Sequence, residues 1–472
     1  MIRKILIANR GEIAVRIARA CTEMGIKSVA VYAEADRNAL HVKKADAAYS
    51  LGPDTIAGYL NAHRLVNMAV ETGCDAIHPG YGFLSENPEL AEICARRGII
   101  FIGPTSQVIR RMGDKIEARS AMIDAGIPVT PGSEGNLASL DEAIDLATEV
   151  GYPVMLKATS GGGGRGIRRC ASEQELRRNY DRVISEATKA FGSAEVFLEK
   201  AIDNPRHIEV QVLADNHGNA IHLFERDCSI QRRHQKLVEI APSPQLSEQQ
   251  RNYIGDLAVR AAKAVGYSNA GTVEFLLDEN DNFYFMEMNT RLQVEHPITE
   301  MITGVDIVQE QIRIADNQTL TYPQEAIQRR GFAMEFRINA EDPKNDFLPS
   351  FGKVTRYFAP GGPGIRTDSA IYTGYVIPPY YDSMCAKLCV WALDWDALLA
   401  RSRRALKDIG VFGVRTTIPY YLEILGSNDF VRGVFDTSFV ERHPELTRYS
   451  VRRSNHDIAA AIGAAIAAST GA

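Results

Sequence analysis

A pair of glutamates in a β-hairpin constrains this chain more than any other sequence feature. Residues 271–277 and 283–289 are two largely apolar runs around an acidic and amide-rich turn, which is the pattern of an antiparallel hairpin. A hairpin that is symmetric about Asn280-Asp281 places Glu274 directly opposite Glu287. Cross-strand Cβ atoms lie about 4.5–5.5 Å apart, and like charges at that separation are destabilising. The sequence therefore predicts an acidic pair that a divalent cation would neutralise.

Polar residues continue along the second strand of this hairpin. Asn289 lies two residues beyond Glu287 and so on the same face of the strand. Two carboxylates and an amide oxygen are hard ligands that suit magnesium bound with a nucleotide phosphate. Polar residues at odd positions, with apolar residues between them, predict that this face extends through Arg291 and Gln293 to Glu295. The alternative interpretation is the solvated face of an edge strand.

A second strand of this type is predicted over residues 332–340. Its apolar residues alternate with Glu335, Arg337 and Asn339. On this pattern alone, Arg337 is interpreted as a surface arginine.

The first hundred residues alternate between short apolar runs and helical patterns. Strands are predicted at residues 5–8, 28–32, 75–77 and 99–102, and a helix begins after the turn that contains Gly11. This alternation predicts an α/β arrangement with a parallel sheet covered by helices. The first turn has a single glycine, so the dinucleotide-binding fingerprint is absent.

A run of glycines stands between two predicted strands, residues 153–158 and 167–170. Gly161, Gly163 and Gly166 match the G-x-G-x-x-G pattern, but this pattern belongs to a Rossmann fold only where it opens a helix. A glycine hairpin can still fold over phosphates, because bare backbone N–H groups approach oxyanions closely. Lys157 at the strand end would add a positive charge. The alternative is a flexible surface loop.

Composition excludes several classes of protein. The chain has 472 residues, enough for roughly three domains. Its net charge of −6 argues against a general nucleic-acid binder and a polybasic membrane surface, and no apolar run approaches the ~20 residues of a membrane span. Seven cysteines without a CxxC pair predict reduced thiols, a cytoplasmic location and no zinc site.

Five ordered motifs resemble one family, the biotin carboxylase members of the ATP-grasp superfamily. These are residues 4–14, 78–87, the glycine run, residues 225–236 and residues 287–296. The resemblance implies that ATP phosphorylates bicarbonate to carboxyphosphate, whose carboxyl group passes to biotin on a carrier protein. A different ATP-grasp ligase, similar to carbamoyl-phosphate synthetase, and a non-catalytic ATP-binding regulator are the alternatives.

The resemblance also implies an ATP-grasp fold of the mixed α/β (α+β) class, with a Rossmann-like N-terminal domain, a mobile glycine-loop lid and a large C-terminal sheet domain. The expected boundaries are 1–113 for the N-terminal pre-ATP-grasp domain, 114–129 for a linker helix, 130–203 for the lid, 204–446 for the catalytic and C-terminal domain, and 447–472 for an Ala-rich helical tail.

The resemblance assigns roles to individual residues. ATP is expected at Lys115, Lys157, Gly161, Gly162, Gly163, Gly164, Gly166, Glu199, Lys200, Ala201, Ile202, His207, Gln231 and His234. Magnesium or manganese is expected at Glu274, Glu287 and Asn289. Bicarbonate is expected at Lys236, Arg291 and the Val294 backbone, with Glu295 as the base; biotin is expected at Arg337, Tyr81 and Gly82.

Partners follow from the same resemblance. The resemblance implies that biotin is carried on a Met-Lys motif, and this chain contains no Met-Lys pair. The biotin carrier and the carboxyltransferase are therefore expected on another polypeptide. Residues 435–446 and the tail, with its stripe of Ile458, Ile462 and Ile466, are similar to the biotin carboxylase subunit of two-subunit pyruvate carboxylases. Acetyl-CoA carboxylase or another acyl-CoA or 2-oxo acid carboxylase is the alternative. The stripe could dock a partner helix or cap its own domain.

The oligomeric state is a further expectation. Related bacterial enzymes dimerise through residues that match Arg19, Glu23 and Arg366, which are present. They carry a phenylalanine where this chain has Pro363. A homodimer or a hetero-oligomer is expected.

Overall fold

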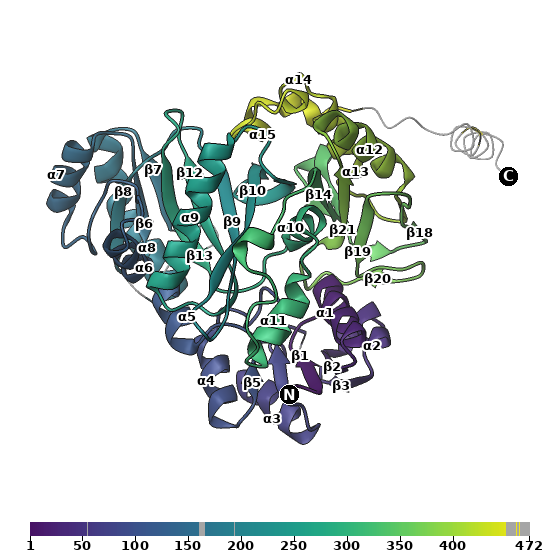
Figure 1. Ribbon diagram of the computed structural model, residues 1–472. Coiled ribbons are helices and arrows are strands. Elements are labelled where there is room, and N and C mark those ends of the chain that lie inside the picture. The colour runs from purple at the N-terminus through teal and green to yellow at the C-terminus, as the bar shows by residue number, and fades with distance from the viewer. Residues whose placement is uncertain (54, 160–165, 193, 450–458, 460–461, 463–472) are drawn as a thin grey trace.

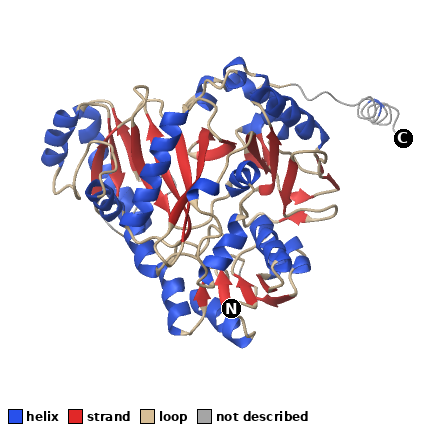
Figure 2. Cartoon of the chain, in the orientation of Figure 1, coloured by secondary structure: helices blue, strands red, loops and turns tan. Residues whose placement is uncertain are grey.

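Three β-sheets of different size organise the chain (Figure 1). The computed structural model describes residues 1–53, 55–159, 166–192, 194–449, 459 and 462. A large antiparallel sheet occupies the centre, a parallel sheet near the N-terminus lies below it, and a small sheet extends to one side (Figures 1 and 2). The mixed α/β class expected from the sequence is confirmed.

The N-terminal part is a five-stranded parallel sheet in the order β3-β2-β1-β4-β5. This is the strand order of a Rossmann-like unit, as the strand–helix alternation predicted. Its apolar strands are buried between helices, which is why they appear as continuous apolar runs. The elements are β1 (Lys4–Ile7), α1 (Gly11–Glu23), β2 (Lys27–Tyr32), α2 (Leu40–Lys44), β3 (Ala47–Ser50), α3 (Ala62–Glu71), β4 (Ala76–His78), α4 (Pro88–Arg96), β5 (Ile100–Phe101) and α5 (Ser106–Gly113).

The linker helix and the small side sheet follow. Asp114 caps the linker helix α6 (Lys115–Asp124) by accepting from the backbone N–H groups of Ile116 and Glu117. The side sheet has the order β7-β6-β8. Its elements are α7 (Leu140–Val150), β6 (Val154–Ala158), β7 (Ile167–Cys170), α8 (Glu173–Phe191) and β8 (Val196–Lys200). Residues 160–165, which hold four of the glycines, lie outside the described residues.

The central sheet has eight strands in the order β13-β12-β9-β10-β11-β14-β21-β19. Its strands are β9 (Arg206–Ala214), β10 (Ala220–Arg232), β11 (Gln235–Ala241), β12 (Asn269–Leu277), β13 (Phe283–Asn289), β14 (Phe332–Asn339), β19 (Ile365–Ser369) and β21 (Met384–Ala392). Helices in this half are α9 (Glu248–Ala264), α10 (His296–Thr303), α11 (Ile307–Ala315), α12 (Trp395–Asp408), α13 (Ile418–Gly426), α14 (Asn428–Val431) and α15 (Phe439–Arg442). Short two-stranded sheets lie in the same part of the chain: β15 (Glu341–Asp342) with β16 (Leu348–Pro349), β17 (Gly352–Lys353) with β20 (Val376–Ile377), and β18 (Arg356–Phe358) with β22 (Gly410–Phe412).

Each half of the central sheet has one apolar face. Val210 of β9 and Phe275 of β12 pack with Leu257 of α9 in one core cluster. Phe336 of β14 packs with Leu398 of α12 in another. Because side chains alternate along a strand, the polar residues between these apolar ones point to the opposite face. Helices α9 and α12 therefore cover one side of the sheet, and the functional groups lie on the other side, which α10 and α11 cover in part.

The predicted acidic hairpin is confirmed, but it reaches its register in an unexpected way. Leu277 pairs with Phe283 and Phe275 with Phe285, so the turn is centred on Asn280. Met286 is then an extra residue at a β-bulge, and the bulge brings Glu274 opposite Glu287.

The predicted extension of this strand is wrong. Strand β13 ends at Asn289, and residues 291–295 form an irregular segment that leads into α10. The alternation of polar and apolar residue types there does not reflect strand geometry: Leu292, Gln293 and Glu295 are all buried, whereas Val294 is half-buried. The second predicted strand is confirmed as β14.

Two further sequence expectations concern the thiols and the tail. All seven cysteines are buried and free. Within the described residues, no helix is both long and apolar enough to cross a bilayer. Of the tail, the structure describes Ala459 and Ile462, which are helical and exposed; the predicted stripe at Ile458 and Ile466 lies outside the described residues.

Candidate active site

A transverse row of charged residues crosses four strands of the central sheet. Arg226 of β10 pairs with Glu209 of β9, Glu209 with Glu274 of β12, and Glu274 with Glu287 of β13. Residues that pair directly across neighbouring strands point to the same face. The row therefore gathers three carboxylates and a guanidinium on the side opposite α9.

Strand β9 supplies a second part of this surface by simple alternation. His207, Glu209 and Gln211 alternate with Ile208 and Val210. The apolar residues pack into the core beneath α9, so the polar ones join Glu274 on the opposite face. His207 Nε2 lies 2.7 Å from Glu274 Oε2. Burial favours neutral His207, but the carboxylate of Glu274 outweighs it and raises the pKa of the imidazole.

The ammonium of Lys236 holds three carboxylates together. Its Nζ atom lies 2.5 Å from Glu209 Oε2, 2.7 Å from Glu295 Oε1 and 3.2 Å from Glu274 Oε1. Burial opposes the charge on Lys236, but these three carboxylates raise its pKa well above the usual value. Lys236 therefore remains charged and offsets the repulsion among the acidic groups.

Glu295 is fully buried, as Glu209 is, at 0% exposure. It occupies the N-cap position of α10, where the positive end of the helix dipole favours a negative charge. Its Oε2 atom accepts a hydrogen bond from the Arg337 guanidinium at 3.1 Å. Burial alone would raise the pKa of Glu295, but Lys236, Arg337 and Arg226 hold it well below the usual range. Glu295 is thus a carboxylate at neutral pH and can accept a proton.

Arg291 is held in place by several neighbours. Its Nε atom donates to Glu86 Oε2 at 2.8 Å, and its terminal nitrogens donate to Asn289 Oδ1 at 2.8 Å and Gln293 Oε1 at 2.9 Å. Glu86 also accepts from the backbone N–H of Thr290 at 3.1 Å. The N-terminal part of the chain therefore fixes the segment between β13 and α10.

Arg337, interpreted from its strand alone as a surface residue, belongs to this cluster. Its Nε atom donates to Glu239 Oε1 at 2.6 Å, and its side chain is 19% exposed. Burial raises the pKa of Glu239 and Arg337 lowers it, with a net rise to about 7. Tyr421 and Thr417 both donate to the Arg337 carbonyl oxygen. The strand pattern could not show this, because every partner comes from a distant segment.

The predicted metal ligands are partly assembled. Glu274 and Glu287 pair across β12 and β13. The Glu287 side chain is exposed to solvent. Loss of hydration next to the surrounding protein, together with the Glu274 and Glu86 carboxylates, raises its pKa. Within the described residues Glu287 forms no close ion pair, although the Lys115 and Lys236 ammonium groups act on it, so this carboxylate pair fits a divalent cation. Asn289 donates its amide nitrogen to Glu274 Oε1 at 2.8 Å, and a half-turn of this amide would present its oxygen. The ligand atoms of His207, Glu209 and Glu274 also lie within 4.8 Å of one another.

The lysines expected to bind phosphate lie near this row. Lys157 at the end of β6 and Arg119 of α6 both form ion pairs with Glu199 of β8. Lys115 begins α6, and burial together with the neighbouring Lys157 ammonium lowers its pKa. Two cations held this close indicate a site for an anion.

Three further residues expected around the nucleotide, Lys200, Ala201 and Ile202, lie at the end of β8 or directly after it. Lys200 donates to the carbonyl oxygens of Gly151 and Tyr152 at 2.8 and 3.0 Å, so its ammonium is engaged with backbone. Ala201 is buried and Ile202 half-buried directly after β8.

Gln231 lies near the end of β10, and His234 lies in the turn between β10 and β11. Arg233 and His234 both have positive φ, 50° and 64°, as the tightest two-residue hairpin requires. Residues other than Gly, Asn and Asp adopt this conformation at a cost. Gly161, Gly162, Gly163 and Gly164 lie outside the described residues; Gly166 has φ of 68° and its carbonyl accepts from Ala158.

Tyr81, Gly82 and Val294 complete the predicted set. Tyr81 follows β4, and its hydroxyl donates to Glu12 of α1. Gly82 is exposed with φ of 68°. The Val294 carbonyl oxygen accepts a hydrogen bond from Lys387 of β21 at 2.7 Å.

Several residues of the cluster were missed by sequence reasoning. Glu209 and Gln211 carry a signal, since they alternate with apolar residues in β9 as Glu274 does in β12. Glu239 and Glu335 pair across β11 and β14 and also alternate with apolar residues. Glu12, Glu86 and Lys387 carry no such signal, because their roles depend on contacts between distant parts of the chain.

Comparisons with known proteins identify the family. Residues 1–109 match the family model "Biotin carboxylase, N-terminal domain", residues 114–322 match "Carbamoyl-phosphate synthase L chain, ATP binding domain", and residues 335–442 match "Biotin carboxylase C-terminal domain". The chain therefore belongs to the biotin carboxylase family with an ATP-grasp fold. It is an ATP-dependent carboxylating ligase that acts on biotin.

Similar proteins agree on this class. A 2-oxoglutarate carboxylase small subunit from Hydrogenobacter thermophilus is 55% identical over 467 residues, which cover 99% of both chains. A pyruvate carboxylase subunit from Methanothermobacter thermautotrophicus is 53% identical, over 94% of this chain and 90% of the relative. A crystal structure of the Hydrogenobacter biotin carboxylase domain dimer, with MgADP, ADP and bicarbonate, has a TM-score of 0.93 at 56% identity and covers 96% of this chain and all of that one.

The buried Arg226 is predicted to maintain the acidic row. Its guanidinium is 0% exposed and donates to Glu209, Gln211, Thr272 and Thr299. Arg226→Met leaves these groups unpaired and should destabilise the fold by about 3–5 kcal/mol. Thermal unfolding followed by calorimetry measures the loss.

A second substitution separates charge from packing in this prediction. Arg226→Met combined with Glu209→Gln removes both members of the pair and should recover part of the lost stability. An equal or greater loss in the double variant would show that the guanidinium acts through packing instead of charge.

Proposed function

We propose that this chain is the biotin carboxylase subunit of a pyruvate carboxylase and carboxylates biotin carried by a separate subunit. The main support for the carboxylation of biotin is the contact of Glu295 with both Lys236, at 2.7 Å, and Arg337, at 3.1 Å. A proton acceptor lies there between a cation assigned to bicarbonate and a cation assigned to biotin. A nucleotide-binding regulator would have no use for that combination.

The roles follow from the positions of the charges. Lys236, Arg291 and the backbone at Val294 bind bicarbonate, and Glu295 accepts its proton as the bicarbonate oxygen attacks the terminal phosphate of ATP. Lys115 and Lys157 hold the phosphates, because phosphoryl transfer depends on positioning and charge neutralisation. Glu274, Glu287 and Asn289 hold magnesium, which neutralises phosphate charge when bound. Arg337 stabilises the enolate form of biotin, and Tyr81 and Gly82 contact its ring.

The glycine run supplies the lid in this proposal. Residues 130–203 close over the nucleotide as one unit, with the adenine against Glu199, Lys200, Ala201 and Ile202, and with His207, Gln231 and His234 in contact with the nucleotide. Carboxyphosphate hydrolyses readily, so a lid that excludes water protects it. Gly132 packs tightly against β8 within this unit, where a Cβ atom would clash with the Leu198 carbonyl oxygen; this contact supports the movement of residues 130–203 as one unit.

Similarity to 2-oxo acid carboxylases supports pyruvate as the final acceptor. The pyruvate carboxylase relative shares 53% identity with this chain. The 2-oxoglutarate carboxylase relative matches 99% of the chain, which makes 2-oxoglutarate the second candidate. Both acceptors are 2-oxo acids, and both relatives are named as subunits of their carboxylases.

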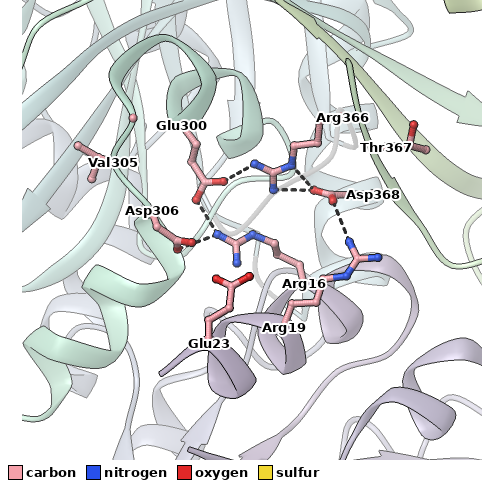
Figure 3. A pocket seen from close by; sticks show the side chains of 10 residues that line it. Arg16, Arg19, Glu23, Glu300, Val305, Asp306, Arg366, Thr367 and Asp368 are labelled. Atoms are coloured by element: carbon pink, nitrogen blue, oxygen red, sulfur yellow. Dashed lines mark hydrogen bonds and ion pairs between the residues drawn. The ribbon is translucent and has the colours of Figure 1, made fainter. Parts of the chain in front are cut away.

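We also propose a homodimer that forms over an ionic cavity beside α1. The cavity, of about 370 Å³, is lined by charged residues of α1, α10 and β19 (Figure 3). Glu300 binds Arg16 through one oxygen at 2.9 Å and Arg366 through the other at 2.6 Å. Arg19 forms an ion pair with Asp368 at 3.4 Å and is 49% exposed, so part of its side chain is accessible to a second copy. The dimeric state of the Hydrogenobacter domain supports this arrangement.

Glu295→Gln is predicted to abolish carboxylation while nucleotide binding persists. The amide cannot accept the bicarbonate proton, so the rate of ADP formation that depends on bicarbonate and free biotin should fall about 100-fold to 10,000-fold. The dissociation constant for MgATP should change less than about twofold. Steady-state kinetics and calorimetric titration measure the two quantities.

The control for this substitution is Glu279→Gln, in the exposed turn of the hairpin, which should keep full activity. Wild-type turnover in Glu295→Gln would remove Glu295 from the mechanism. Absence of any bicarbonate-dependent turnover in the unmodified chain would favour a non-catalytic regulator.

The final acceptor is predicted to be pyruvate. The tagged chain is purified from its own cells with its biotinylated partner, which streptavidin detects. The complex is then supplied with ATP, radiolabelled bicarbonate and either pyruvate, 2-oxoglutarate or acetyl-CoA. Label should enter an acid-stable product with pyruvate. Incorporation with 2-oxoglutarate alone supports the second candidate, and incorporation with acetyl-CoA alone contradicts both.

The dimer is tested by two opposite substitutions. Arg19→Glu reverses a charge at the cavity and should raise the dimer dissociation constant at least about tenfold. Pro363→Phe places an aromatic side chain on an exposed loop, as in related enzymes, and should lower this constant. Sedimentation velocity measures both, with Arg177→Glu on the exposed face of α8 as control. An unmodified chain that is monomeric at every concentration would contradict the proposal.

A further inference from the structure

The pair formed by Glu12 and Lys387 is the most deeply buried ion pair that the reaction does not use. Lys387 lies on β21 and Glu12 in the first turn of α1, and their side chains are 0% and 2% exposed. Lys387 Nζ lies 3.2 Å from Glu12 Oε1. The two residues are 375 positions apart and join the N-terminal domain to the central sheet.

Each member of this pair holds one wall residue of the proposed site. Lys387 Nζ donates to the Val294 carbonyl oxygen at 2.7 Å, directly before Glu295. Glu12 Oε1 accepts from the Tyr81 hydroxyl, and the Lys387 ammonium lies 5.9 Å from the centre of the Tyr81 ring. Val294 is assigned to bicarbonate and Tyr81 to biotin, so this ion pair connects the binding positions of the two substrates.

Lys387 is also linked to Arg337 through the sheet. The two residues pair directly across β14 and β21, and Asp368 of β19 pairs with Lys387 on its other side. The three side chains therefore share one face. Burial opposes the charge on Lys387, but Glu12, Glu335 and Asp368 raise its pKa, so the ammonium remains charged.

We propose that the Glu12–Lys387 ion pair is a positioning device that fixes Tyr81 and Val294 relative to each other, and so sets the distance between biotin and bicarbonate. This inference rests on the proposed function, because that function assigns the two substrates to Tyr81 and Val294. Buried ion pairs rarely add stability over apolar side chains of similar size, and their best-supported use is to specify one geometry. Here the pair joins the loop after β4 to the segment before α10, beside the contacts of Glu86 with Thr290 and Arg291.

The first test is Lys387→Met, which keeps the length of the side chain and removes its charge. With the Val294 carbonyl and Glu12 released, the KM values for biotin and bicarbonate should rise between about tenfold and about a hundredfold. The KM for ATP should stay within about twofold, because Lys115 and Lys157 are anchored elsewhere. Steady-state kinetics with free biotin measure all three constants.

The second variant separates the contact between Glu12 and Tyr81 from the contact between Lys387 and Val294. Glu12→Leu releases Tyr81 but leaves the hydrogen bond from Lys387 to Val294, so the KM for biotin should rise more than the KM for bicarbonate. The double variant should raise the KM for biotin no further than Lys387→Met does, because both substitutions break one linkage. Independent, additive effects would overturn the proposal.

A matched control identifies a merely structural effect. Glu225 and Arg251 form another buried ion pair, at 2.8 Å, beneath α9. Glu225→Gln should lower the thermal midpoint without a selective change in any KM. If Lys387→Met instead behaves like this control, or changes all three KM values equally, the pair only stabilises the fold and the proposal is wrong.

Two further measurements remove ambiguity. If Lys387→Met does not fold, Glu12→Gln keeps the shape of the side chain, and the same selective rise in the KM for biotin is required of it. Tyr81→Ala tests the assignment of biotin directly. A normal KM for biotin in Tyr81→Ala contradicts the proposed function, whereas a raised KM there with normal values in Lys387→Met contradicts this inference alone.

Discussion

One buried ammonium determines the charge balance of the whole site. Lys236 contacts Glu209, Glu274 and Glu295 within 3.2 Å, and without it three carboxylates would face each other in a protein environment. Charges are buried only where partners offset the loss of hydration. The opposite signs on neighbouring strands are therefore a condition for folding as well as for binding anionic substrates. Any anion that enters competes with the glutamates for Lys236.

The two faces of the central sheet explain how such a cluster coexists with a stable fold. Apolar residues of β9 and β12 pack beneath α9, and those of β14 pack beneath α12. Alternation along each strand then places every second residue on the opposite side, where Glu209, Glu274 and Arg337 lie. The charged groups occupy only part of that side, because other positions on it, such as Leu213 of β9 and Ala333 of β14, pack in further core clusters with α11 and α10.

The sequence predicted those parts of the fold and site that depend on local pattern. The parallel sheet, the hairpin and the strand carrying Arg337 follow from periodicity, and the motifs indicated the family. The bulge at Met286 could not be predicted, because shifting the turn by one residue leaves the composition of both strands unchanged. The end of β13 at Asn289 was also missed, since the alternation of polar and apolar residue types continues into the loop, where the polar Gln293 and Glu295 are buried as well. Arg337 changes from a surface residue to a cluster member only through Glu239 and Glu295, which are 98 and 42 positions away.

Helix α10 connects the proton acceptor to the ionic cavity. Glu295 forms its N-cap, and Glu300 lies one and a half turns further along, where Arg16 and Arg366 bind its two oxygens. An eight-residue helix is about 12 Å long and moves as a unit. Its N-terminal end is anchored by Lys236 and Arg337, and its middle by arginines from α1 and β19. The position of Glu295 therefore depends on contacts made at the N-terminal end and in the middle of this short helix, including contacts that line the cavity proposed for a second copy of the chain.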